Sequence, residues 1–132
     1  MLLSTLLLII YNAMIISMAN SLTNNKKSVK RVRRIVTVVV SVRNEENNLP
    51  ILLDLLINQT YPKTLYEIII ANDRSTDNTE KILEKKCNEY DNLKYINIVS
   101  TPLDWAPKKW ALNKAIDNAK GDVIVQTDGD CR

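Results

Sequence analysis

The sequence predicts an α/β fold with a Rossmann-like, doubly wound parallel sheet and flanking helices over residues 35–132. One observation is the order of segments, in which short apolar runs alternate with stretches that carry apolar residues at helical spacing. The other is the composition of the runs, which are nearly continuous in Val and Ile, as in strands buried on both faces. Together they indicate the order βαβαβαβ.

The first half of this pattern begins with a strand over residues 35–42, a run rich in β-branched side chains. A helix follows, because leucines recur at positions 49, 52, 53 and 56. Tyr61 and Pro62 end this helix, since proline cannot continue it. The second strand is expected over residues 67–71.

The second half begins at Asp77 and Glu80, which have the spacing of a capping box and predict a helix start. The inward face of that helix is expected to carry Ile82, Leu83, Lys86, Cys87 and Tyr90. A third strand follows over residues 93–99. Pro107 then opens a helix, whose inward residues are predicted to be Leu112, Ala115, Ile116 and Ala119. The fourth strand spans residues 122–127.

The N-terminus carries a separate signal. Residues 1–20 are mostly apolar and uncharged, which predicts an uncleaved transmembrane anchor. A cleaved signal peptide is the alternative, but no Lys or Arg precedes the apolar run and residues 17–20 make a poor cleavage site. A basic linker, residues 21–34, holds six Lys and Arg after that run. The positive-inside rule therefore predicts a single-pass membrane protein with its soluble domain in the cytoplasm.

Composition excludes several classes of function. Setting those six basic residues aside leaves 12 Lys and Arg against 15 Asp and Glu, so the rest of the chain gives no argument for nucleic acid binding. The sequence contains no His, which excludes Ser-His-Asp and Cys-His nucleophiles within it. Its two glycines exclude a Walker loop and a G-x-G-x-x-G turn. Cys87 and Cys131 are isolated and are predicted to be free thiols.

Polar clusters follow three of the predicted strands, at residues 43–46, 72–77 and 128–130. Ligands of open α/β sheets bind at the carboxyl ends of the strands, where these clusters meet. Asp128 and Asp130 are spaced to hold an oxygen-loving cation, Mg²⁺ or Mn²⁺. Glu46 and Asp77 are better explained as helix caps. The pattern predicts a pocket for a nucleoside diphosphate bound through a metal.

These residues resemble a known family. Four motifs follow one another as in family 2 glycosyltransferases with the GT-A fold, namely residues 41–46, 72–79, 108–113 and 128–130. The resemblance covers about residues 35–132, which makes this the N-terminal, donor-binding part of a GT-A domain, truncated just after the Asp-x-Asp motif. It implies an inverting, metal-dependent transfer of a sugar from a nucleotide-diphosphate sugar to an acceptor hydroxyl.

The resemblance also implies roles for the residues after the first two strands. Glu45 resembles the acid that lies near the nucleoside, and Asn72 and Asp73 resemble the pair that contacts the base. Many family members have Asp at the position of Asn72. Arg74 stands where the family usually has glycine, so the conformation of that turn is open.

At the other end of the pocket, Lys108 matches a basic residue that approaches the diphosphate, with a solvated helix start as the alternative. Trp110 is expected to pack in the core rather than to hold a sugar. Asp128 would face the ribose or the metal, and Asp130 would bind the metal. The general base of the family lies well downstream of the Asp-x-Asp motif, so no catalytic base is assigned in this segment.

The expected function is therefore the donor-binding half of a glycosyltransferase, inactive as an isolated fragment, with a lipid-linked or polysaccharide acceptor and no nucleic acid partner. The alternative is a membrane-tethered nucleotide-binding module, or a truncated fragment, without transferase activity. A phosphate-accepting receiver domain would share the sheet, but it would need an aspartate after the third strand, where Ser100, Thr101 and Pro102 stand instead.

Overall fold

The computed structural model describes residues 11–18 and 33–129. The chain divides into two compact units, Met1–Val32 and Arg33–Arg132. In the first unit, residues 11–18 are helical, and no helix in the described part of the chain is long and apolar enough to cross a membrane. The structure therefore does not support the predicted anchor, of which residues 1–10 and 19–20 lie outside the description, as do residues 21–32 of the basic linker.

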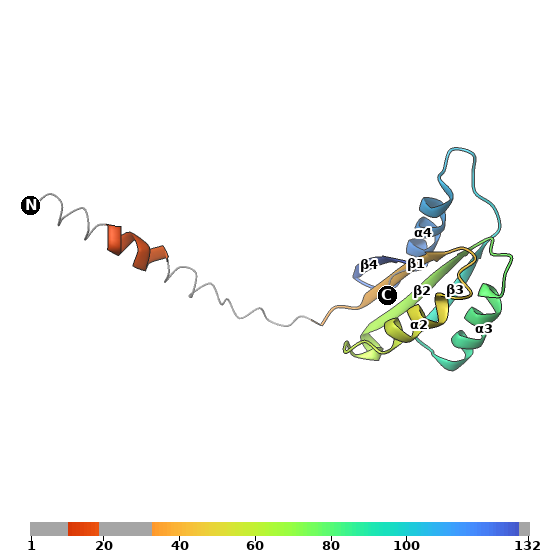
Figure 1. Ribbon diagram of the computed structural model, residues 1–132, viewed down its shortest axis with the longest axis horizontal. Coiled ribbons are helices and arrows are strands. Elements are labelled where there is room, and N and C mark those ends of the chain that lie inside the picture. The colour runs from red at the N-terminus through yellow and green to blue at the C-terminus, as the bar shows by residue number, and fades with distance from the viewer. Residues whose placement is uncertain (1–10, 19–32, 130–132) are drawn as a thin grey trace, which may run out of the picture. The chain divides into compact units, whose positions relative to one another are not determined.

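The second unit contains the predicted α/β fold (Figure 1). Its elements are β1 (Val36–Val42), α2 (Leu49–Ile57), the short 3₁₀ helix η1 (Lys63–Leu65), β2 (Tyr66–Asp73), α3 (Thr79–Glu89), β3 (Leu93–Ile98), α4 (Pro107–Asp117) and β4 (Val123–Asp128). The four strands form one sheet in the order β3-β2-β1-β4, and every neighbouring pair is parallel. The predicted order of strands and helices is confirmed.

Strand β1 lies inside the sheet, which explains its composition. Val36 is paired with Tyr66 of β2 on one side and with Val123 of β4 on the other. Both faces of β1 are covered by helices, so Val39 and Val40 are fully buried although their side chains point to opposite faces. A continuous β-branched run satisfies both faces at once.

Two apolar clusters hold the helices on the sheet. Helices α2 and α3 cover one face, where Leu53 and Leu83 pack with Val40 and Ile70. Helix α4 covers the opposite face through residues that pack with Val39 and Ile69, and these helix residues are Ala111, Leu112 and Ala115. Ile116 was predicted to join them, but its side chain is 42% exposed, so that assignment is wrong.

The start of α3 also differs from the prediction. Its N-cap residue is Asn78 rather than Asp77. Glu80 does not reach back to close a capping box; its Oε1 instead accepts a hydrogen bond of 2.6 Å from Asn97 Nδ2 on β3. Only one half of the predicted capping box forms: Asp77 Oδ1 accepts from Thr79 N–H at 3.0 Å. The glutamate half is wrong because Glu80 is bound by a residue of a neighbouring strand, which its position along the chain does not reveal.

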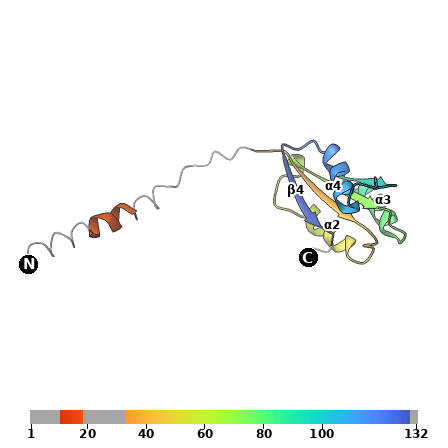
Figure 2. The ribbon, with the colours of Figure 1, turned by 90° about the horizontal axis from the view of Figure 1, so that it is seen from above.

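Strand β4 forms one edge of the sheet (Figure 2). The chain enters it by a close approach to β1, where Gly121 N–H donates to Thr37 Oγ1 at 2.9 Å. A Cβ on Gly121 would lie 2.6 Å from Thr37 N, so only glycine fits there. Val123, Ile124 and Val125 of β4 are 41%, 39% and 44% exposed, which makes β4 the least covered strand.

The strand order also determines where a ligand can bind. The connections through α2 and α3 lie on one face of the sheet, and the connection through α4 lies on the other. The direction of winding therefore reverses between β1 and β4. In open α/β sheets, a crevice forms at the carboxyl ends of the two strands where this reversal occurs.

Candidate functional site

A cavity of about 480 Å³ lies at the carboxyl ends of β1 and β4. Its lining residues are Ser41, Val42, Arg43, Glu45, Asp73, Ala106, Pro107, Lys108, Asp128 and Gly129. Four of the predicted site residues, Glu45, Asp73, Lys108 and Asp128, thus lie around one cavity although they come from four separate segments. Asn72 does not line it, and Asp130 lies outside the described residues.

Glu45 is held in place by the turn between β1 and α2. Its backbone N–H donates to Thr79 Oγ1 at 2.9 Å, and its carboxylate accepts from Asn48 Nδ2 at 2.8 Å. Asn44, which has a φ of 55°, connects this turn to the next loop, because its Oδ1 accepts from Thr76 N at 2.7 Å. These bonds present Glu45 at the cavity on a fixed backbone.

Glu46 and Asp77 brace the same two loops against each other. Glu46 N–H donates to Asp77 Oδ2 at 3.1 Å, and Asn78 N–H donates to Glu46 Oε2 at 3.0 Å. Desolvation raises the pKa of Asp77, but hydrogen bonds from Thr79 and from Glu46 N–H outweigh it and hold that pKa below its usual value. Both acids bind backbone donors at the start of α3, but neither is the predicted cap residue, because the N-caps of α2 and α3 are Asn48 and Asn78.

Asp73 is nearly inaccessible and is held by its neighbour in the chain. Its residue exposure is 4%, and Arg74 donates to both of its carboxylate oxygens, from Nε at 2.8 Å and from Nη2 at 3.2 Å. Arg74 has a φ of 53°, the left-handed conformation that favours glycine. The turn therefore has the backbone conformation typical of glycine. The guanidinium group of Arg74, which a glycine would lack, neutralises Asp73.

Asn72 lies on the other face of β2, because successive strand residues point to opposite faces. It lines a neighbouring cavity of about 340 Å³, together with Arg74, Ser75, Glu80, Asn97, Ile98 and Val99. Its Nδ2 donates to Asn97 Oδ1 at 2.8 Å, while Asn97 in turn donates to Glu80. Asn97 and Glu80 were not predicted as site residues; the polar Asn97 between two isoleucines of β3 was the available signal.

Lys108 and Asp128 form an ion pair beside the cavity. Lys108 Nζ lies 2.8 Å from Asp128 Oδ1, and the two side chains are 59% and 50% exposed. Gly129 allows the end of β4 to approach β1 closely, since a Cβ there would lie 3.1 Å from Val42 Cγ1. Exposed pairs of this kind contribute little to stability, so the pair can be opened by a ligand.

Trp110 packs beneath this region, as predicted. Its side chain packs against the cluster on the α4 face of the sheet. Its ring meets that of Trp105 edge to face, with centroids 5.3 Å apart, and Lys114 Nζ lies 4.5 Å from its centroid. These contacts leave the ring occupied on several sides and give it a structural role.

The described residues fit a magnesium-like ion in part. In residues 11–18 and 33–129, no group of three or more His, Cys, Asp or Glu is arranged to hold a metal ion. Asp128 offers a half-exposed carboxylate at the cavity. Mg²⁺ is commonly bound by one or two carboxylates, with phosphate oxygens and water as the other ligands. A carboxylate beside a cavity for a diphosphate suits that mode of binding.

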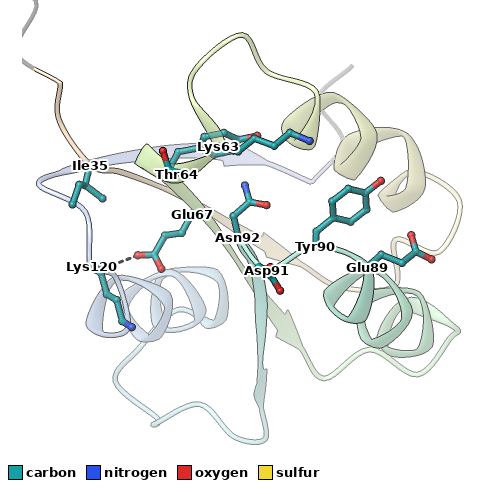
Figure 3. Close-up of a pocket in the computed structure, with 10 residues that line it drawn as sticks. Ile35, Lys63, Thr64, Glu67, Glu89, Tyr90, Asp91, Asn92 and Lys120 are labelled. Atoms are coloured by element: carbon teal, nitrogen blue, oxygen red, sulfur yellow. Dashed lines mark hydrogen bonds between the residues drawn. The ribbon is translucent and has the colours of Figure 1, made fainter.

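A larger cavity, of about 610 Å³, lies at the amino ends of the strands (Figure 3). Two of its charged groups, Glu67 and Lys63, have partners within the protein. Glu67 accepts from Lys120 N–H at 2.6 Å and from Thr37 Oγ1 at 2.8 Å, and Lys63 Nζ lies 5.8 Å from the centre of the Tyr90 ring. Burial raises the pKa of Glu67, but the hydrogen bonds that Glu67 accepts have the larger effect. The pKa therefore lies below its ordinary value of 4.5. These groups stabilise the fold.

Comparisons with known proteins agree with this geometry. A family model described as glycosyl transferase family 2 matches residues 37–132. Glycosyltransferase AglE of Haloferax volcanii is 32% identical over 96 residues, which are 73% of this chain and 30% of AglE. Solved structures of relatives, two of which follow, are similar to this chain in fold.

The mannosyltransferase PcManGT of Pyrobaculum calidifontis, in complex with GDP-Man and Mn²⁺, has a TM-score of 0.67 and 28% identity, over 76% of this chain and 28% of that protein. S. aureus TarS 1-349 in complex with UDP has a TM-score of 0.63 and 34% identity, over 72% of this chain and 27% of that protein. The chain thus spans less than a third of the length of each of these relatives.

Proposed function

The chain belongs to glycosyl transferase family 2, and on that premise we propose that it binds the nucleotide-diphosphate sugar donor of a glycosyltransferase. The observation that carries this proposal is the cavity at the carboxyl ends of β1 and β4, which is lined by the acids Glu45, Asp73 and Asp128 and by Lys108. It lies at the reversal of winding where such sheets bind nucleotides. The nucleotides present in the structures of relatives, GDP-Man and UDP, support the same class of ligand.

Each described residue has a proposed task in that cavity. Glu45 and Asp73 contact the nucleoside, with Asp73 oriented by Arg74. Lys108 and the backbone N–H groups at the start of α4 bind the diphosphate, because a helix N-terminus and a lysine both favour an anion. Asp128, with Asp130, would hold Mg²⁺ or Mn²⁺, and such an ion neutralises the charge that develops on a departing diphosphate. Asn72 acts from the adjoining cavity by supporting the end of β2.

The reaction proposed is a single displacement at the anomeric carbon, which inverts its configuration. It needs a general base for the acceptor hydroxyl, and no described residue is assigned to that task. A lipid-linked or polysaccharide acceptor, and attachment of the chain to the cytoplasmic side of a membrane through residues 1–20, belong to this proposal as well. The apolar composition of those residues supports the attachment.

Calorimetric titration of the full chain with UDP and with GDP, in Mn²⁺ and in chelator, tests the proposal. We expect binding that depends on the metal, and a loss of metal affinity of at least about tenfold in Asp128→Asn, the size found when residues around a metal are removed. Asp117→Asn is the matched control, because Asp117 is also half exposed and paired with a lysine, but on the far end of α4. Equal binding in chelator would contradict the metal assignment.

A further inference from the structure

We propose that Lys108 neutralises Asp128 until the ligands bind, and that the metal and the diphosphate break this ion pair only by binding together. As a result, the two ligands bind as one unit, and each alone binds weakly. This inference rests on the proposed function, which assigns the cavity to a metal-bound diphosphate. It adds a task for Lys108 before the ligands bind and a coupling between the two ligands.

The geometry places one ion pair where two ligands are expected. Lys108 lies in the first turn of α4 and Asp128 at the end of β4, and their charged atoms meet at 2.8 Å. Both residues line the same cavity, so their contact lies at its surface, beside the space that we assign to the diphosphate. The ammonium group lies beside the carboxylate, at the position that we assign to a metal cation.

The surroundings of Lys108 favour exchange of its partner. The first turn of α4 contains no acidic residue and carries both Lys108 and Lys109. A cation there faces the positive end of the helix dipole, which disfavours it. Asp128 offsets this charge, and a diphosphate would offset it more fully because it brings more negative charge to the same end of the helix.

Charge balance then couples the two ligands. The diphosphate of a nucleotide sugar carries two negative charges and Mg²⁺ or Mn²⁺ carries two positive ones, so together they enter between Lys108 and Asp128 without changing the net charge. The metal alone would place its charge beside the displaced ammonium group, and the diphosphate alone would face Asp128. Either ligand therefore removes the repulsion that the other meets, which is a reciprocal coupling of the two affinities.

The test measures Mn²⁺ binding to the full chain by electron paramagnetic resonance, with and without UDP or GDP. For the unmodified chain we expect the nucleotide to tighten Mn²⁺ binding by about tenfold or more, within the usual range of such couplings. In Lys108→Met, Mn²⁺ alone should bind more tightly than in the unmodified chain, the nucleotide should bind more weakly, and the coupling should fall towards one.

Three controls keep the outcomes separate. Lys109→Met removes the neighbouring charge in the same turn and should leave the coupling unchanged. Lys108→Arg keeps the charge and should restore most of it. Thermal unfolding checks that each variant is folded.

If Lys108→Met weakens Mn²⁺ and nucleotide binding alike, or leaves Mn²⁺ binding unchanged, the counter-ion role is wrong. An unmodified chain that binds nucleotide with Mn²⁺ but shows no coupling overturns this inference while the proposed function stands. A folded chain that binds neither overturns both.

Discussion

Arg74 offers a sharp test of the backbone at the end of β2. Its φ of 53° lies in the left-handed region, which costs residues with a side chain about 1–2 kcal/mol relative to the right-handed one. Arg74→Gly and Arg74→Ala both remove the guanidinium that binds Asp73, so the lost ion pair cancels when the two variants are compared. They differ in whether the left-handed conformation is strained.

The expected difference has an unusual sign. Elsewhere, Gly is less stable than Ala by about 0.5–1 kcal/mol, because the unfolded chain has more freedom to lose. At position 74 the relief of strain exceeds this term, so we expect Arg74→Gly to be more stable than Arg74→Ala by about 0.5–1 kcal/mol. For a unit of this size, that is a difference in melting temperature of a few degrees, on the order of 2–8 °C.

Thermal or urea unfolding of the full chain, followed by circular dichroism, measures the difference. The same pair of substitutions at Lys85, an exposed residue within α3, is the control, and there Ala should be the more stable by about 1 kcal/mol. An Arg74→Ala variant as stable as Arg74→Gly would refute the left-handed turn, and with it the reason why Arg can replace glycine at this position.

Two further predictions concern the amino ends of the strands. Gly121→Ala should destabilise the fold by about 1–3 kcal/mol, because the new Cβ would lie 2.6 Å from Thr37 N in β1. Ala119→Gly nearby is a control that adds no atom. An unchanged unfolding midpoint for Gly121→Ala would contradict the close approach. Glu67 has a pKa held below 4.5, so its contribution to stability should be present above pH 4.5 and lost as the pH falls through the lowered pKa. Stability measured between pH 7 and pH 3 should fall less steeply in Glu67→Gln than in the unmodified chain, and parallel pH profiles would show that Glu67 does not supply this dependence.

Much of the architecture could be predicted from local patterns. The run at residues 35–42 predicts a buried strand because only β-branched side chains suit both of its covered faces, and the structure confirms it as β1. The leucines of α2 repeat at helical spacing because only one face of this helix packs on the sheet. Position after a strand also predicted Glu45, Asp73 and Asp128, since parallel strands end at one edge of the sheet.

The sequence by itself therefore determined the order of elements, the family and the edge of the sheet at which the site lies. Tertiary structure alone decided which of the polar residues meet. Lys108 pairs with Asp128 and Glu80 binds Asn97 because strand order and register bring these segments together, and the exposed face of Ile116 depends on how α4 lies on the sheet. Periodicity records which side of an element is apolar, whereas contacts between distant segments depend on how complete elements pack.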